Sequence, residues 1–271
     1  MLETVSSMFS YDFMVRAIVV GILVSLCAAL LGVSLVLKRY SMIGDGLSHV
    51  GFGALSIALA MNVAPLVVSI PVVVIAAFLL LRISENSKIK GDSAIAIISS
   101  SALAIGIIVT SLTTGMNLDI NSYMFGSILA ISESDVWLSV ILTVIVLVLF
   151  VLFYNKIFAV TFDENFAKAV GTKTNIYNML IAVLAAITIV VGMRMMGALL
   201  ISSLIIFPSL TSMRVFKSFR SVVISSAIIS VVCFIIGITV SFLYPVPAGP
   251  SIVITNLIAF LIFWLVGKIK R

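Results

Sequence analysis

Asp45 and His49 are the two residues whose types and spacing best suit chemistry. They stand in SMIGDGLSHVGFG, within a mostly apolar stretch, and His49 is the chain's one histidine. On a helix, an i, i+4 spacing places both side chains on one face, with Cβ atoms about 5–6 Å apart. A carboxylate beside an imidazole suits zinc, manganese or ferrous iron. The pair is therefore a candidate metal-binding site.

The same pair also has a structural interpretation. Asp45 can cap the helix that begins near it, and His49 can be a hydrogen-bonded interior residue. An ionisable group within a membrane costs roughly 2.5–3.5 kcal/mol, which favours a functional role. Two donors are few for a metal site, but two copies of the chain around a two-fold axis would double them. Met193, Met195 and Met196 are weaker candidates, because methionines at helical spacing usually pack in a core.

The elements that must position these residues are hydrophobic. Of 271 residues, 62% are hydrophobic and 10% are charged, with a mean hydropathy of +1.35. About a quarter of the residues in a soluble domain are charged, so this composition excludes a soluble enzyme, a disordered chain and a nucleic-acid-binding protein. Cys27 and Cys233 lie far apart in apolar runs, where each is expected to be a small buried hydrophobe. We expect no disulfide framework and no cysteine metal site.

Apolar runs predict an all-α polytopic membrane protein with about nine transmembrane helices in a single domain, residues 1–271. A span needs about 20 mostly apolar residues. Eight to ten spans are possible, because only residues 62–64 separate the second run from the third and only Arg194 separates the sixth from the seventh. The runs cover residues 17–37, 42–61, 65–81, 93–112, 136–154, 176–193, 195–212, 222–244 and 251–266. Between the fourth and fifth, residues 123–131 are apolar but too short to cross, which favours a re-entrant or interfacial helix.

Basic residues predict the orientation. With alternate loops placed on one side, all of the 16 Lys and Arg residues fall together except Arg16 and Arg194. Cytoplasmic loops carry the excess of Lys and Arg. Nine spans therefore place the N-terminus outside and the C-terminus in the cytoplasm.

The longest predicted cytoplasmic loop, residues 156–175, contains a predicted amphipathic helix at residues 162–171. Thr161 and Glu164 fit a capping box, and Asp163 and Glu164 suit a first turn. Gly171 is placed to end the helix. The helix either rests on lipid headgroups or lies in a groove of a cytoplasmic partner, and periodicity does not separate these alternatives. Its apolar face comprises Phe162, Phe166, Ala167 and Val170.

Missing motifs exclude several mechanisms. GTKT at Gly171 lacks the first glycine and the GK pair of a P-loop, and no H-E-x-x-H motif occurs. No serine turn is evident that would face His49 in an intramembrane protease. Proton-driven pumps carry chains of intramembrane carboxylates, whereas Asp45 is the one acidic residue inside a predicted span. The chain is therefore expected to lack an energy source of its own.

Taken in order, these motifs resemble the membrane permease subunit of bacterial zinc/manganese/iron ABC importers. The resemblance covers nearly the whole chain and rests on LGVSLVLKRYSMIGDGLSHVGFGAL, SYMFGSILAIS, FDENFAKAVG, GALLISSLIIFPSLTS and PAGPSIVITN. It implies a type II ABC importer-like permease in the bacterial cytoplasmic membrane, with a divalent metal ion as substrate and no permanently bound cofactor. FDENFAKAVG looks like the family's ATPase coupling helix. Asp45 and His49 look like its metal-binding residues in the translocation path.

The resemblance also implies the partners. They are a second permease copy, two cytoplasmic ATPase subunits that hydrolyse the ATP, an extracytoplasmic metal-binding protein and membrane lipid, with no nucleic acid. The chain itself is then a transport subunit and not an enzyme. Zinc is favoured because imidazole is a good zinc ligand, with manganese and iron as alternatives. The rival hypothesis is an ion-coupled secondary transporter or channel, which predicts inverted repeats with broken helices and no dependence on an ATPase. An intramembrane enzyme is the weakest alternative.

Overall fold

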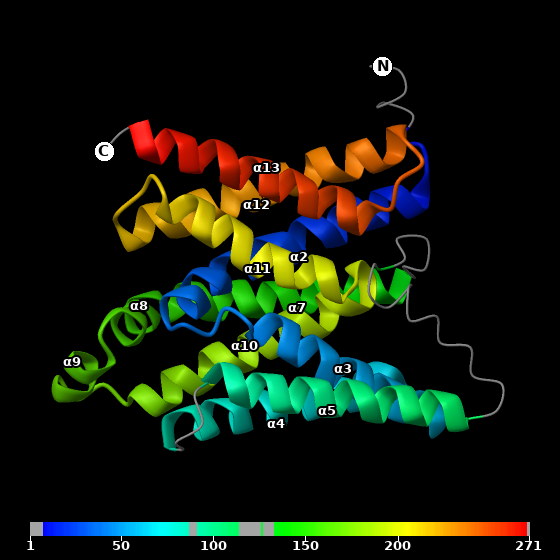
Figure 1. Cartoon of the computed structure of the whole chain (residues 1–271), viewed down its shortest axis with the longest axis horizontal. Coiled ribbons are helices and arrows are strands. Elements are labelled where there is room, and N and C mark those ends of the chain that lie inside the picture. Colours follow the sequence, from blue (N-terminus) through cyan, green and yellow to red (C-terminus); the bar gives the residue numbers. More distant parts are fainter. Residues whose placement is uncertain (1–7, 87–90, 114–125, 127–132, 270–271) are drawn as a thin grey trace.

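The computed structural model describes residues 8–86, 91–113, 126 and 133–269, and the regular elements within them are all α-helices (Figure 1). The chain thus has the all-α architecture that its composition predicts. The helices are α2 (Asp12–Leu37), α3 (Ile43–Ala60), α4 (Pro65–Asn86), α5 (Gly91–Leu112), α7 (Glu133–Leu152), α8 (Tyr154–Phe162), α9 (Glu164–Ala169), α10 (Thr174–Met196), α11 (Ala198–Met213), α12 (Phe219–Leu243) and α13 (Ala248–Ile269).

Each of the nine predicted apolar runs forms a helix, but the helices differ in length. Six are long and apolar enough to cross a membrane, namely α2, α3, α5, α10, α12 and α13. A seventh span results if α7 is joined to α8, which bends away from it by 71°. The apolar parts of α4 and α11 are shorter, Pro65–Leu80 and Ala198–Met213. At 1.5 Å per residue, α11 is about 24 Å long, less than the roughly 30 Å of a bilayer core.

The sixth and seventh apolar helices separate at Gly197, not at Arg194 as the sequence suggested. α10 continues through Arg194 to Met196, and α11 begins at Ala198. Gly197 has φ +89° and ψ 157°. A residue with a Cβ rarely adopts that conformation, so the glycine supplies the break that a single charged side chain does not.

The helices form three groups that lie side by side in Figure 1. α12 and α13 lie along one edge, α3, α4 and α5 lie along the opposite edge, and α2, α7, α10 and α11 lie between them. α2 packs against α7, α10, α11 and α12, and α3 packs against α4, α5, α10 and α11. The apolar windows of α5 and α13 are only 11% buried. These two helices therefore offer broad apolar surfaces to lipid or to another chain.

Glycines allow α3 to approach its neighbours closely. A Cβ on Gly53 would lie 2.7 Å from the carbonyl oxygen of Ala102 in α5, and one on Gly51 would lie 2.4 Å from the methyl carbon of Met193 in α10. Small residues at such contacts let helix backbones come together in a membrane. Of the predicted re-entrant segment 123–131, only Gly126 belongs to the described residues.

Candidate functional site

Asp45 and His49 lie in the first two turns of α3. Met42 is the N-cap of this helix and no side chain caps it, while Asp45 lies inside the first turn. The interpretation of Asp45 as a helix cap is therefore wrong, although its negative charge still suits the positive end of the helix dipole. His49 Nε2 lies 3.7 Å from Asp45 Oδ2. This distance is too long for a hydrogen bond, so the two atoms are not hydrogen-bonded to each other.

The two side chains differ in burial. The Asp45 side chain is 42% exposed and the His49 side chain is 17% exposed. The inner ring nitrogen, His49 Nδ1, is buried and has no hydrogen-bond partner among the described residues. Buried polar atoms nearly always have a partner, and each exception needs a reason. In the described part of the chain His49 is thus not the satisfied interior histidine of the structural interpretation.

The start of α3 packs closely against two neighbouring helices. Gly44 faces α11, where an added Cβ would lie 3.0 Å from the Ile205 side chain and 3.6 Å from the Ser202 Cα. Gly46 faces α5, where the corresponding distance to the Ile95 side chain is 2.5 Å. Asp45 lies between these two contacts. Its helical turn therefore cannot easily move independently of α5 and α11.

The described residues of one chain supply few other metal donors. They contain no group of three or more His, Cys, Asp or Glu side chains that could hold an ion. The three candidate methionines are 1%, 2% and 5% exposed and belong to the hydrophobic core. The Met195 sulfur accepts a hydrogen bond from the Ser139 hydroxyl at 3.1 Å. Packing is therefore the role that the structure supports for Met193, Met195 and Met196.

The predicted helix 162–171 is divided into two. α8 ends at Phe162, and Asp163 has extended backbone angles (φ −147°, ψ 96°) before α9 begins at Glu164. The Asp163 side chain accepts the backbone N–H of Phe166 at 2.9 Å, so Asp163 is the N-cap of α9. The predicted Thr161–Glu164 capping box is wrong, because Thr161 lies buried within α8.

Gly171 ends α9 as predicted. Its φ is +83°, and its N–H donates to the Lys168 carbonyl at 3.1 Å. The N–H of Thr172 donates to the Ala167 carbonyl at 2.9 Å. These two bonds form a Schellman motif, in which glycine adopts the left-handed conformation without steric cost.

The apolar face of this segment is smaller than predicted. Phe162, Phe166 and Val170 are 76%, 66% and 66% exposed, whereas Ala167 is 2% exposed and packs inward. α9 has only six residues, and Phe162 belongs to the preceding helix. The exposed apolar surface therefore comes from the bend between two short helices and not from one continuous helix.

Glu164 makes contacts that the sequence did not predict. Its carboxylate accepts a hydrogen bond from Lys38 Nζ at 2.8 Å and another from the Asn178 side-chain amide at 2.9 Å. Lys38 follows α2 and Asn178 lies in α10. Lys38 is one of the basic residues that indicate the orientation, and no sequence pattern marks it as a partner of Glu164. One signal was available for Asn178, which is a polar residue inside an apolar run.

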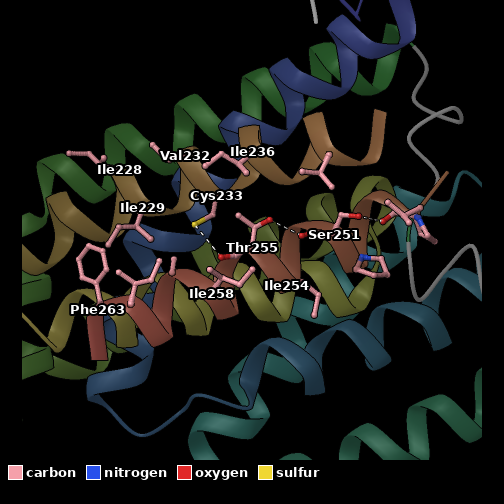
Figure 2. Close-up of a pocket in the computed structure, with 16 residues that line it drawn as sticks. Ile228, Ile229, Val232, Cys233, Ile236, Ser251, Ile254, Thr255, Ile258 and Phe263 are labelled. Atoms are coloured by element: carbon pink, nitrogen blue, oxygen red, sulfur yellow. Dashed lines mark hydrogen bonds between the residues drawn. The ribbon is translucent and has the colours of Figure 1, made fainter. Parts of the chain in front are cut away.

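An apolar groove lies far from both segments, between α12 and α13 (Figure 2). Its volume is about 800 Å³ and its walls are mainly isoleucine and valine. The Ser251 hydroxyl donates to the Pro247 carbonyl at 2.8 Å, and the Thr255 hydroxyl donates to the Ser251 carbonyl at 2.9 Å. The groove offers no charged group to a metal ion, so it is not the candidate site.

Comparisons with known proteins agree on one group of relatives. The model of the ABC 3 transport family matches residues 10–267. The manganese import system permease protein ScaB of Streptococcus gordonii is 28% identical over 269 residues, covering 99% of this chain and 96% of that protein. The high-affinity zinc uptake system membrane protein ZnuB of Haemophilus influenzae is 29% identical over 252 residues, covering 93% and 97%. A chain in the solved structure of PsaBC from Streptococcus pneumoniae in complex with Fab is 29% identical, with a TM-score of 0.87, and the match covers 100% of this chain and 99% of that one.

Proposed function

The chain belongs to the ABC 3 transport family, and we propose that it carries a divalent metal ion through the membrane with Asp45 and His49 as transient ligands. It is a multi-pass membrane permease of a metal-ion ABC importer, a transport subunit and not an enzyme. Relatives named for manganese and for zinc both support a metal-ion substrate. Their names do not choose between the two ions.

The observation that carries the proposal is the state of the Asp45/His49 pair. Zinc binds histidine nitrogen and carboxylate oxygen at about 2.0–2.2 Å in tetrahedral sites, which separates two donors by about 3.4 Å. The observed 3.7 Å between Nε2 and Oδ2 is close to that separation. The two atoms are not hydrogen-bonded to each other at this distance, so neither lone pair is used by the other and both can bind an ion.

A complete site in this proposal needs a second copy of the chain. One chain offers two donors, and a metal site usually needs four. A two-fold axis near α3 would supply two aspartates and two histidines. Two donors from each copy also suit transient binding. When the two copies move relative to each other, the four donors no longer surround the ion.

Among the divalent ions we propose zinc, on the chemistry of the imidazole alone. Zinc favours nitrogen and sulfur ligands as well as carboxylates, whereas manganese suits carboxylate and water more than imidazole. Two aspartates and two histidines serve both, so manganese is the alternative.

The α8–α9 bend is the proposed contact with a cytoplasmic ATPase. The surface of Phe162, Phe166 and Val170 is exposed and apolar, which suits a groove on a protein partner. Figure 1 supports the predicted orientation, since α9 and the end of α13 lie at one end of the molecule and the start of α2 lies at the other. On this orientation the C-terminus is cytoplasmic, and an extracytoplasmic protein would deliver the ion near the start of α2.

The decisive experiment measures ATP-dependent uptake of radioactive zinc and of manganese in proteoliposomes that contain the permease with its co-purified ATPase. We expect uptake that stops when ATP is replaced by a non-hydrolysable analogue, and competition that ranks the two ions. Uptake that continues in vesicles without the ATPase would instead favour an ion-coupled transporter.

A further inference from the structure

Three side chains, one just after α2, one from α9 and one from α10, form a ring of hydrogen bonds beneath α9. Lys38 Nζ donates to Glu164 Oε2 at 2.8 Å and to Asn178 Oδ1 at 2.6 Å. The Asn178 amide nitrogen donates to Glu164 Oε1 at 2.9 Å. Both carboxylate oxygens and both ends of the amide are therefore engaged. We call Lys38, Glu164 and Asn178 the α9 anchor.

The α9 anchor is better shielded than an ordinary surface ion pair. The side chains of Lys38 and Glu164 are 11% and 38% exposed, and Asn178 is 6% exposed. Removing one partner from a shielded pair leaves the other charge without compensation, which costs far more than loss of an exposed pair. The network therefore couples the position of α9 to that of Lys38.

Lys38 in turn is joined to the candidate metal site by a tight connection of five residues between α2 and α3. The N–H groups of Arg39 and Tyr40 donate back to the last turn of α2 at 3.1 and 2.8 Å, and Ile43 donates to the Tyr40 carbonyl at 3.0 Å. Arg39 has φ +63°, a left-handed conformation that is unfavourable for a residue with a Cβ. These hydrogen bonds restrict how far Lys38 and Asp45 can move independently of each other.

We propose that the α9 anchor is the link through which movement of α9 reaches Asp45 and His49. This inference rests on the proposed function. An ATPase bound to the Phe162–Phe166–Val170 surface would move α9. This movement would pull on Glu164, whose side chain lies on the opposite side of α9. Glu164 would then shift Lys38 and, with it, the start of α3. Lys38, Glu164 and Asn178 touch no ion and are positioning residues.

Metal binding by Asp45 and His49 is sensitive to small movements, so a link from α9 to these residues can control it. Metal–ligand bonds of about 2.0–2.2 Å tolerate only small errors in donor position. Displacement of the first turn of α3 by a few tenths of an ångström would change the separation of Asp45 and His49 from a second copy's pair. Binding and release of the ion would therefore follow the position of α9.

A different result is expected if the α9 anchor has only a structural role. If the three residues only hold α9 in place, their loss lowers membrane abundance or ATPase binding, and uptake and ATP hydrolysis fall together. If they transmit movement, the complex stays assembled and hydrolyses ATP while uptake per ATP falls. The ratio of uptake to hydrolysis separates the two roles.

The test uses Lys38→Glu, Glu164→Lys and the double reversal in the co-purified complex, reconstituted in proteoliposomes. Each single variant leaves two like charges facing each other. We expect about a tenfold fall in zinc transported per ATP hydrolysed, the scale of a hydrogen bond to a charged group, with the ATPase still bound. The double reversal restores the opposite charges, and Asn178 can satisfy both by turning its amide. It should recover most of the ratio. Lys173→Glu, an exposed lysine at the start of α10, is the matched control and should leave the ratio unchanged.

The outcomes separate this inference from the proposed function. Metal uptake by the unaltered complex without ATP would overturn the proposed function itself. If the unaltered complex is ATP-driven, an unchanged ratio in the single variants, or a double reversal that folds but stays uncoupled, overturns the link. Should the reversals reduce abundance, Glu164→Gln retains the side-chain shape. Hydrolysis kept with uptake lost then supports the link, and equal loss of both overturns it.

Discussion

The Asp163 carboxylate accepts the backbone N–H of Phe166 at 2.9 Å, and this bond determines how α9 leaves α8. The extended backbone of Asp163 interrupts the helix, and its side chain starts a new one three residues before Phe166. The exposed rings of Phe162 and Phe166 therefore project from two different helices. The apolar surface offered to a partner depends on the bend as much as on the aromatic residues.

Phe166→Asp is predicted to release the ATPase. A buried aromatic anchor at an interface contributes on the order of 2 kcal/mol or more, so its loss weakens the complex about thirtyfold. A pull-down in detergent should recover the permease without the ATPase, and uptake should stop while membrane abundance stays normal. Phe166→Leu, which keeps an apolar side chain, is the matched control and should retain the ATPase. Retention of the ATPase by Phe166→Asp, with normal uptake, would mean that the segment rests on lipid.

Loss of the α9 cap is predicted to weaken the same contact more mildly. Asp163→Ala removes the side chain that accepts the Phe166 N–H, at a cost of about 1 kcal/mol for a helix cap. We expect roughly a fivefold weaker complex, measured by titration of the ATPase onto the permease in nanodiscs. Asp163→Asn, which can still cap, should bind nearly as well as the unaltered chain. Equal affinities for Asp163→Ala and Asp163→Asn would contradict a role for the bend.

The double variant Asp45→Ala/His49→Ala is predicted to abolish metal-dependent growth and radioactive zinc uptake at unchanged membrane abundance. Removing the two donors leaves the ion without ligands from the chain. The packing around Gly44 and Gly46 does not involve the replaced side chains, so the fold should persist. Uptake at a normal rate in this variant would make the pair structural.

Opposite sides of the membrane are predicted for Asn62 and Lys217. Both are exposed, Asn62 between α3 and α4 and Lys217 between α11 and α12. In a background of Cys27→Ala/Cys233→Ala, which removes two buried thiols, single cysteines at these positions can be labelled. An impermeant maleimide on intact cells should modify position 62 and spare position 217. The reverse pattern would invert the orientation and move the ATPase contact to the wrong side.

Gly53→Val is predicted to separate α3 from α5. The new Cβ would meet the Ala102 carbonyl oxygen at 2.7 Å, and a backbone atom cannot move aside as a flexible side chain can. Overpacking of this kind costs about 1–3 kcal/mol. The purified protein should unfold at a lower temperature than the unaltered chain. Ala96→Val on the exposed face of α5 adds similar bulk without a clash and should unfold at the normal temperature, and an equal shift in both variants would refute the packing explanation.

The sequence by itself determined the features that arise within a few residues. Each apolar run became a helix, because a membrane segment satisfies its backbone within itself. The i, i+4 spacing placed Asp45 and His49 one turn apart, and Gly171 ended α9 through its own positive φ. These outcomes depend on local hydrogen bonds and steric limits, and a single sequence carries that information.

Tertiary structure decided the rest. The sequence predicted Thr161 as the cap and Asp163 in the first turn, whereas Thr161 lies buried in α8 and Asp163 caps α9. Ala167 shares a helical face with Phe166 in sequence, yet it packs inward while the ring stays exposed. Lys38 meets Glu164 across 126 positions of sequence. Such choices depend on which distant segments pack together, and that free energy is shared among side chains that no local pattern connects.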